Sequence, residues 1–218
     1  MIQTVIFDMD GVIIDSEPVH KFAYYKHFEE MGISVSEELF STFTGNSTKN
    51  VYQKIKDLFQ LDFEVQEMVL RKRSLFYEAF DLKEDLYLID GVEQLIKSLY
   101  DAGFDLILAS SAAKTTIDRV FKRFNLDRYF LHKVSGEDFV KSKPDPAIFL
   151  HAASLSMHPK SACIVIEDST NGIKAAFDAG IFCVGYISAN TKKQDLSLAS
   201  VIIDDFNVIT PEYIKKLQ

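Results

Sequence analysis

The sequence predicts an α/β protein in which a parallel sheet is covered by helices on both faces and carries an all-helical insert. Three observations lead to this prediction. The first strand is a run of consecutive apolar residues, Val5-Ile6-Phe7, which is typical of a strand buried on both faces. From residue 84 onward, strand and helix patterns alternate with short links, which implies right-handed βαβ crossovers. Residues 16–83 show helix patterns only.

The predicted first strand ends in two carboxylates, Asp8 and Asp10, which are followed by Gly11. Asp and Gly are frequent in turns for local reasons, so these residues are consistent with a simple turn. The carboxyl ends of parallel strands are also where open α/β sheets bind their ligands. The first strand alone therefore supports a turn and a binding site about equally.

The helical insert is predicted from apolar residues that recur at helical spacing. Gly32 follows the first helix as a stop signal, and Ser47 is a candidate N-cap for the third. Linkers at both ends, near 16–18 and 83–89, connect the insert to the sheet, which is the connectivity of a lid on hinges. The helices are expected over 17–31, 37–43, 47–59 and 64–82.

The remainder of the chain alternates between helices and strands. Asp90-Gly91 opens the first helix of this part, and Pro146 suits the first turn of a later one. We expect a core domain of residues 1–15 and 84–218 and a helical cap domain of residues 16–83. Core helices are expected over 90–102, 114–124, 144–155, 171–179 and 211–217, and further strands over 104–109, 133–135, 162–166, 182–186 and 201–203.

Composition limits the classes of protein to consider. The 218 residues are 47% hydrophobic, enough for a packed core, and no run reaches the ~18 apolar residues of a membrane span. The formal net charge of −8 argues against nucleic acid as a partner, because phosphate-backbone binding relies on a basic surface. Cys163 and Cys183 lie in separate apolar runs, as reduced thiols do, and no secretory signal is visible. We expect a cytoplasmic protein without a membrane partner, and a monomer rather than an oligomer.

Polar side chains recur where the predicted strands end. Ser110 follows the strand over 104–109, and Glu167-Asp168 follow the strand over 162–166. Lys143 lies just before a predicted helix. Parallel strands have their carboxyl ends at the same edge of a sheet. One rim of the sheet is therefore expected to collect Asp8, Asp10, Ser110, Glu167 and Asp168.

Carboxylates crowded along one rim repel one another and need a cation to remain ionised together. Mg²⁺ suits such a site, because it prefers oxygen ligands and binds one or two carboxylates together with water and phosphate. Lys143 and the Ser110 hydroxyl would then bind phosphate oxygens. Asp8 would attack phosphorus to form an aspartyl phosphate. Asp10 would protonate the leaving oxygen and later deprotonate a water.

Each of these residues has a simpler explanation when it is taken alone. A serine such as Ser110 is more often a strand-end cap than a ligand. Lys143 taken alone is a surface lysine, and Glu167-Asp168 taken alone would cap the helix that begins near Asn171. The order of these residues at successive strand ends is what favours one shared site.

Four segments together resemble the haloacid dehalogenase superfamily of phosphohydrolases, and the resemblance covers essentially the whole chain. An acid at position 10 is typical of its phosphate-ester branch, whereas the dehalogenase branch lacks it. The segments are Phe7-Asp8-Met9-Asp10-Gly11-Val12, Ser110 after an apolar strand, Lys143-Pro144-Asp145-Pro146, and Glu167-Asp168-Ser169 with Gly172 and Ala175-Ala176.

The resemblance implies a Rossmann-like core with a Mg²⁺ site and a phosphate site. Mg²⁺ would be held by the Asp8 carboxylate, the Asp10 backbone carbonyl and Asp168, while Glu167 would act mostly through a water. Phosphate contacts would come from Ser110 and Lys143. Ser111 belongs to an acceptable variant of the same phosphate-binding loop.

The helical insert resembles the cap of the β-phosphoglucomutase-like and sugar-phosphate phosphatase subgroup, whose opening matches 15–18 and His20. The resemblance implies that His20 helps to position Asp10 as the cap closes. It also implies a substrate role for Lys72, although a basic run such as 71–73 is otherwise a solvated helix face. A helix-surface histidine remains the alternative for His20. The substrate-specificity loop is expected at residues 44–49, with Gly45, Thr48 and Lys49.

Two positions depart from this subgroup. The mutase has an arginine about where this chain has Thr48, and the adjacent Lys49 lacks the bidentate fork of a guanidinium. A mutase must hold the distal phosphate of a bisphosphorylated intermediate, so the missing arginine argues against mutase activity. Ile89-Asp90-Gly91 lacks the proline that commonly precedes the glycine and stiffens the exit hinge.

These observations lead us to expect a Mg²⁺-dependent phosphatase of small phosphorylated metabolites, with sugar phosphates as the first class to test. It would act through an aspartyl phosphate on Asp8, with Asp10 as general acid and base. A β-phosphoglucomutase-type phosphotransferase is the alternative. A remote alternative is a non-enzymatic signalling protein that uses phospho-aspartate as a switch, although receiver domains of that kind are about half this length and have no helical cap.

Overall fold

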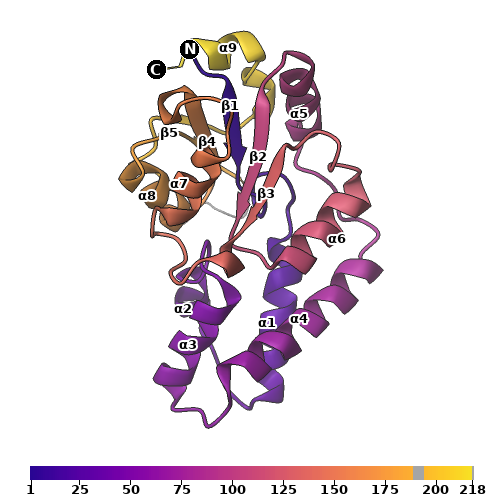
Figure 1. The fold of residues 1–218 in the computed structure, drawn as a ribbon. Coiled ribbons are helices and arrows are strands. Elements are labelled where there is room, and N and C mark those ends of the chain that lie inside the picture. Colours follow the sequence, from indigo (N-terminus) through magenta and orange to yellow (C-terminus); the bar gives the residue numbers. More distant parts are fainter. Residues whose placement is uncertain (189–193, 218) are drawn as a thin grey trace.

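The computed structural model describes residues 1–188 and 194–217 and places a parallel sheet at one end of the molecule and four helices at the other (Figure 1). The six strands lie in the order β3-β2-β1-β4-β5-β6, and every neighbouring pair is parallel. The predicted α/β fold class is therefore confirmed. The strands are β1 Thr4–Phe7, β2 Asp105–Ser110, β3 His132–Ser135, β4 Cys163–Glu167, β5 Phe182–Tyr186 and β6 Val201–Ile203.

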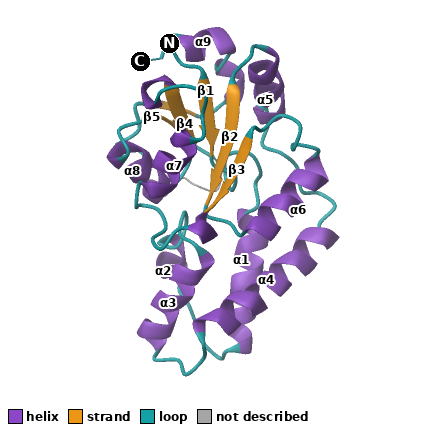
Figure 2. Cartoon of the chain, in the orientation of Figure 1, coloured by secondary structure: helices purple, strands orange, loops and turns teal. Residues whose placement is uncertain are grey.

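The central strand β1 is apolar throughout because both of its faces are covered. Val5 and Phe7 pack into one hydrophobic cluster, and Ile6 between them packs into another on the opposite face. α5 Val92–Asp101, α6 Lys114–Phe124 and α9 Pro211–Lys215 contribute to the first cluster. α7 Ala147–Ser154 and α8 Thr170–Asp178 contribute to the second. The sheet is thus sandwiched between two layers of helices, as Figure 2 shows.

The four cap helices form a hydrophobic core of their own, built on aromatic residues such as Phe28 and Tyr52. α1 and α4 lie side by side and extend back toward the sheet (Figure 1), where Phe76 and Phe80 of α4 join the first sheet cluster. The cap helices are α1 Glu17–Glu30, α2 Glu37–Ser41, α3 Thr48–Phe59 and α4 Val65–Leu82. The exact division into domains at residues 15/16 and 83/84 stays a prediction.

The two linkers that connect the cap helices to the sheet run next to each other. Ile14 pairs with Leu88 in an isolated antiparallel bridge, and the Ile89 amide donates a hydrogen bond of 3.0 Å to the Ile13 carbonyl. Entry to and exit from the cap are therefore joined at the base, close to the end of β1. No helix in the described part of the chain is long and apolar enough to cross a membrane.

Element boundaries differ from the sequence-based expectations by a few residues. Ser110 is the last residue of β2 rather than the first residue after it. Pro146 precedes the first turn of α7 as its N-cap instead of lying within that turn. Ser47 caps α3 as predicted, since its side chain accepts a hydrogen bond from the Asn50 amide. Helix ends are decided by individual capping contacts, which periodicity alone does not specify.

Candidate active site

The expected rim exists where β1, β2 and β4 end beside one another. Asp8 directly follows β1, and its amide donates to the Ile166 carbonyl of β4 at 3.0 Å. Phe7 is in register with Leu108 of β2 and Ile166 of β4, so the residues that follow these positions come together at one edge. The strand ends therefore bring Asp8 beside Glu167, and Asp168 follows immediately.

The turn after β1 brings the backbone against Asp168. Gly11 has a φ of +87°, a conformation that favours glycine, and its amide donates to the Ile14 carbonyl. A Cβ atom at Gly11 would lie 1.9 Å from an Asp168 carboxylate oxygen. The glycine is therefore required both for the turn and for the close approach of the two acidic segments.

Lys143 is a buried anchor of this site rather than a surface lysine. Its side chain is 1% exposed, and its ammonium lies 2.5 Å from Asp8 Oδ1, 2.9 Å from Glu167 Oε1 and 3.1 Å from the Ala109 carbonyl oxygen. These three contacts take up the three N–H donors of the ammonium group. Burial opposes its charge, but the two carboxylates outweigh burial and raise the pKa of Lys143. The lysine therefore remains positively charged and fixes both carboxylates.

Glu167 is held on both of its carboxylate oxygens. Oε1 faces Lys143, while Oε2 accepts hydrogen bonds of 2.7 Å from the amides of Asp168 and Ser169. Ser169, rather than Glu167, is the N-cap of α8, and its hydroxyl accepts from the Gly172 amide at 3.0 Å. Glu167 therefore links Lys143 to the segment that opens α8. Its contacts with the Asp168 and Ser169 amides are part of the helix-capping role that the sequence suggested for it.

The acidic groups fit a hard divalent cation. Ligand oxygens of Asp8, Glu167 and Asp168 all lie within 4.8 Å of one another. Burial raises the pKa of Asp8 to about 7, with Glu167 and Asp10 adding to the effect and Lys143 opposing it. Burial and the neighbouring carboxylates also raise the pKa of Asp168. Mg²⁺ would bind these carboxylate oxygens and reduce the repulsion between their negative charges.

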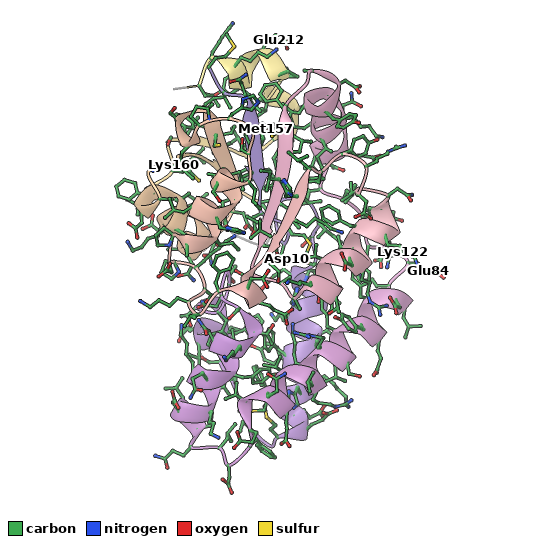
Figure 3. The ribbon with its side chains drawn as sticks, in the orientation of Figure 1. Asp10, Glu84, Lys122, Met157, Lys160 and Glu212 are labelled. Carbon is green, nitrogen blue, oxygen red and sulfur yellow. The ribbon has the colours of Figure 1, made fainter. Side chains whose placement is uncertain are left out.

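Asp10 lies where the sheet meets the cap helices (Figure 3). The Ser16 hydroxyl donates to its carboxylate, and His20 Nε2 lies 3.4 Å from the same oxygen. Burial acts to raise the pKa of Asp10, but His20, Ser16 and Lys72 outweigh burial and lower it. Asp8 and Asp10 are thus two neighbouring carboxylates whose environments shift their pKa values in opposite directions.

His20 is oriented by Lys72 from a different cap helix. Lys72 Nζ lies 2.7 Å from His20 Nδ1, and the His20 ring stacks on Phe76 at 4.3 Å between centroids. When Lys72 is an ammonium it only donates, so Nδ1 then accepts and Nε2, which faces Asp10, carries the ring proton. Burial lowers the pKa of Lys72 to about 7. Lys72 is 2% exposed, which the basic run at 71–73 did not suggest.

A cavity of about 90 Å³ lies between the strand ends and the cap. Of the residues predicted to bind substrate or phosphate, those lining it are His20, Gly45, Thr48 and Ser111. Ser110 is fully buried and does not line this cavity, and its hydroxyl accepts from the Ala112 amide at 3.0 Å. Lys49 instead lines a neighbouring cavity of about 250 Å³, together with Arg73 and Glu137. Thr48 and Ser111 line both cavities.

The cap meets the sheet domain around these cavities through polar contacts. Ser111 Oγ donates to the Gly45 carbonyl at 3.0 Å, and the Asn171 side chain donates to the Thr44 carbonyl at 2.9 Å. Arg73 forms a 2.6 Å ion pair with Glu137. Residues of the 44–49 loop therefore line the same cavity as Asp8, Asp10 and Asp168.

Sequence reasoning missed Glu17 as a site residue, as well as the aromatic side chains on the cap side of the cavity. Glu17 is the first residue of α1 and lines the same cavity as Asp8. Its position within the entry linker near 16–18 is the signal that could have identified it. The aromatic residues that line the cavity are Tyr24, Phe40 and Phe43.

Comparisons with known proteins show the family to which this chain is similar. A family model described as haloacid dehalogenase-like hydrolase matches residues 5–186. The phosphorylated carbohydrates phosphatase of Thermotoga maritima is 30% identical over 82% of this chain and 82% of its own length. Protein SUPPRESSOR OF QUENCHING 1, chloroplastic, of Arabidopsis thaliana is 30% identical over 84% of this chain, but only 18% of its own length is matched. The crystal structure of β-phosphoglucomutase from Clostridium difficile superposes with a TM-score of 0.86 and 26% identity over 99% of this chain and 96% of that one.

Proposed function

The chain belongs to the haloacid dehalogenase-like hydrolases, and we propose that it is a Mg²⁺-dependent phosphatase of small phosphorylated metabolites, with sugar phosphates as the substrate class. One observation carries the proposal. The Asp8 carboxylate, fixed by the buried Lys143, faces the same cavity as Asp10 and Asp168. A nucleophile, an acid–base group and a cation site are therefore within one small volume.

In the proposed reaction, an Asp8 carboxylate oxygen attacks phosphorus and the bond to the leaving oxygen breaks. Asp10 gives its proton to that leaving oxygen, which departs as an alcohol. Asp10 then takes a proton from a water whose oxygen attacks the aspartyl phosphate, so that phosphate is released and Asp8 is regenerated. The lowered pKa of Asp10 favours this second role as a base.

The remaining residues position the reacting groups. Lys143 keeps one Asp8 oxygen fixed by their 2.5 Å contact, which leaves the other oxygen as the nucleophile. Ser110 accepts a hydrogen bond from the Ala112 amide, so its own O–H remains a donor for a phosphate oxygen. When bound between Asp8, the Asp10 carbonyl and Asp168, Mg²⁺ would supply positive charge for the carboxylates and the phosphate.

The cavity composition favours a phosphatase over a mutase. The cavity of about 90 Å³ that contains Asp8 and Asp10 is called the catalytic cavity below. Among the described residues that line it there is no lysine or arginine. Thr48 lines it where the mutase has an arginine, and Lys49 faces the neighbouring cavity instead. A mutase must retain a bisphosphorylated intermediate, which needs a cation for the distal phosphate. The superposition on a β-phosphoglucomutase nevertheless makes the phosphotransferase the second candidate.

A paired assay tests the proposal. Phosphate release is measured with Mg²⁺ on a panel of hexose and pentose phosphates, beside a coupled assay for conversion of β-glucose 1-phosphate to glucose 6-phosphate with a bisphosphate primer. We expect release without isomerisation, and loss of turnover in Asp8→Asn. Isomerisation that outruns release would favour the mutase. Activity that persists in a clean Asp8→Asn preparation would exclude Asp8 as the nucleophile.

A further inference from the structure

Glu17 stands out among the carboxylates of the catalytic cavity. It is half-buried at the start of α1, and its side chain lines the cavity together with Asp8 and Asp10. Burial raises the pKa of Glu17; His20 and Lys72 oppose that effect, while Asp10 and Asp15 add to it. Burial of an ionised carboxylate costs free energy, so the placement of Glu17 in this cavity calls for an explanation.

The other acidic groups of the cavity either have a partner, as Asp8, Asp10 and Asp15 do, or belong to the cluster that fits a cation. Asp8 pairs with Lys143, and Asp10 accepts from Ser16. Asp168 belongs to the cluster of ligand oxygens that fits a cation, and Glu17 does not. Within residues 1–188 and 194–217, the Glu17 carboxylate has neither a hydrogen bond nor an ion pair. Its acceptor oxygens therefore remain available inside the substrate cavity.

A purely local explanation accounts for only part of this arrangement. A glutamate in the first turn of a helix is favoured by the helix dipole, typically by about 0.3–1 kcal/mol at an exposed position. Glu38 in the first turn of α2 is such a residue, since it is exposed to solvent and lies away from both cavities. Glu17 also lies in the first turn of its helix, but it lines the cavity that contains Asp8 and Asp10. The helix dipole gives no reason for that placement.

The chemistry of the cavity indicates what Glu17 would bind. A carboxylate only accepts hydrogen bonds, so its partners must be donors such as hydroxyl groups. Phosphate and carboxylate groups on the leaving part of a substrate offer no such donors at neutral pH, and the described lining residues include no lysine or arginine to receive them. Tyr24, Phe40 and Phe43 supply apolar surface for the carbon skeleton.

We propose that Glu17 is a specificity-determining residue that accepts hydrogen bonds from hydroxyl groups of the leaving group, so that polyhydroxylated monophosphate esters are preferred. This inference rests on the proposed phosphatase function and adds to it the feature of the substrate that is recognised. Hydrogen bonds to a charged acceptor are stronger than those between neutral groups. Removal of the Glu17 charge therefore acts on hydroxylated substrates more than on substrates without hydroxyl groups.

The experiment compares esters that carry hydroxyl groups with esters of the same ring size that carry none. Glucose 6-phosphate is matched with cyclohexylmethyl phosphate, which has the same ring size and no hydroxyl group. Ribose 5-phosphate is matched in the same way with cyclopentylmethyl phosphate. Each ester is measured as a substrate and as a competitive inhibitor of p-nitrophenyl phosphate hydrolysis, so that binding is read even where turnover is slow. The proteins are the wild type, Glu17→Gln, Glu17→Ala and the control Glu38→Gln.

We expect the wild type to prefer at least one hydroxylated ester over its matched analogue by about tenfold or more in kcat/KM or in inhibition constant. Glu17→Ala should reduce that preference ratio by about tenfold, and Glu17→Gln should reduce it in part because the amide keeps a neutral acceptor. Glu38→Gln should leave the ratio unchanged. A structural role for Glu17 would change both members of a pair equally and leave the ratio intact.

Two results would overturn the inference. One is a wild type that binds and hydrolyses both members of every pair equally well. The other is a preference that survives unchanged in Glu17→Ala. Either result leaves the phosphatase function standing if p-nitrophenyl phosphate is hydrolysed with Mg²⁺ and hydrolysis is lost in Asp8→Asn. Absence of any hydrolysis by the wild type would instead contradict the proposed function itself.

Discussion

The ammonium nitrogen of Lys143 lies 2.5 Å from a carboxylate oxygen of Asp8, although 135 positions separate the two residues in the chain. Both side chains are buried, with exposed fractions of 1% and 9%. A buried ion pair gives little net stability compared with apolar packing, but loss of one partner leaves an uncompensated charge. The stability of this region therefore depends on both members of the pair being present.

The first prediction concerns Lys143→Met. The substitution removes the positive charge from between Asp8 and Glu167 and leaves two buried carboxylates unpaired. We expect the free energy of unfolding in EDTA to fall by about 3–5 kcal/mol, as measured by urea denaturation. Lys174→Met is the control, because Lys174 pairs with Asp178 on the surface of α8 and should cost less than about 1 kcal/mol. Equal losses in the two variants would contradict the anchoring role of Lys143.

The second prediction concerns Gly172→Ala. Gly172 lies inside α8, where alanine would ordinarily be favoured by about 1 kcal/mol. A Cβ atom at this position would lie 1.7 Å from Glu167 Oε1, which Lys143 holds in place. Overpacking should therefore outweigh helix propensity, with a destabilisation of about 1–3 kcal/mol and a loss of phosphatase activity.

Gly32→Ala is the matched control for this clash. Gly32 has a φ of +70°, but no atom lies within 4 Å of a Cβ atom built on it. The backbone strain should cost about 1–2 kcal/mol of stability and leave activity unchanged. Thermal melts and phosphate-release rates on both variants separate strain from displacement of Glu167. A fully active Gly172→Ala would show that Glu167 moves aside without consequence.

The third prediction concerns the cation site. Mg²⁺ in excess should raise the thermal unfolding temperature relative to EDTA, because it binds the folded protein and relieves the buried carboxylates; a concentration of 100 Kd corresponds to about 2.7 kcal/mol. Asp168→Asn should abolish that rise. It should also stabilise the protein in EDTA, because it removes a buried carboxylate whose pKa is raised by burial and by Glu167.

Asp62→Asn serves as the control for the metal effect, because Asp62 is exposed and lies outside the cluster of ligand oxygens. It should retain the full response to Mg²⁺. A rise in unfolding temperature that is the same in Asp168→Asn and the wild type would place the cation elsewhere.

The fourth prediction is a pH dependence that arises in the cap core. His27 is 5% exposed, and its Nδ1 lies 2.6 Å from the Tyr52 hydroxyl oxygen. Burial lowers the pKa of His27, with Arg71 adding to the effect and Glu30 opposing it. In the range between the lowered folded pKa and the unfolded value of about 6.5, the unfolded chain binds more protons. Stability contributed by His27 is therefore present above about pH 6.5 and is lost as the pH falls below it.

Urea denaturation of the wild type and His27→Gln at several pH values between about 5.5 and 7.5 tests this sign. The difference in unfolding free energy between the two proteins should shrink as the pH falls. The comparison between variants cancels the contributions of the other histidines. A difference that is constant with pH would show that His27 has the same pKa in the folded and unfolded states.

The carboxylate set at the strand ends could be predicted, whereas the partners of its members could not. Asp8, Glu167 and Asp168 are adjacent because parallel strands end at the same edge, which follows from the order of the elements. Lys143 follows no strand, and its local sequence is that of an exposed loop. Only the packing of the chain before α7 against the sheet buries it.

In the cap, too, the helices could be predicted from the sequence, whereas the contacts between their side chains could not. The helices of the cap were predicted from their periodicity, since α1, α3 and α4 agree with the expected spans within a few residues. The contact between His20 of α1 and Lys72 of α4 depends on how these helices pack against each other. Thr48 lines both cavities and Lys49 only the neighbouring one, which depends on where α3 begins and on how the cap faces the sheet.

The sequence by itself determined the fold class, the order of its elements and the acidic residues at the strand ends, because strand burial, helix periodicity and strand direction are properties of local patterns. Tertiary structure decided that Lys143 pairs with Asp8, that Lys72 contacts His20, and that Glu17 lines the cavity of Asp8 and Asp10 without a partner among the described residues. These contacts join side chains from separate elements, and their geometry is set by packing between helices and sheet rather than by spacing along the chain.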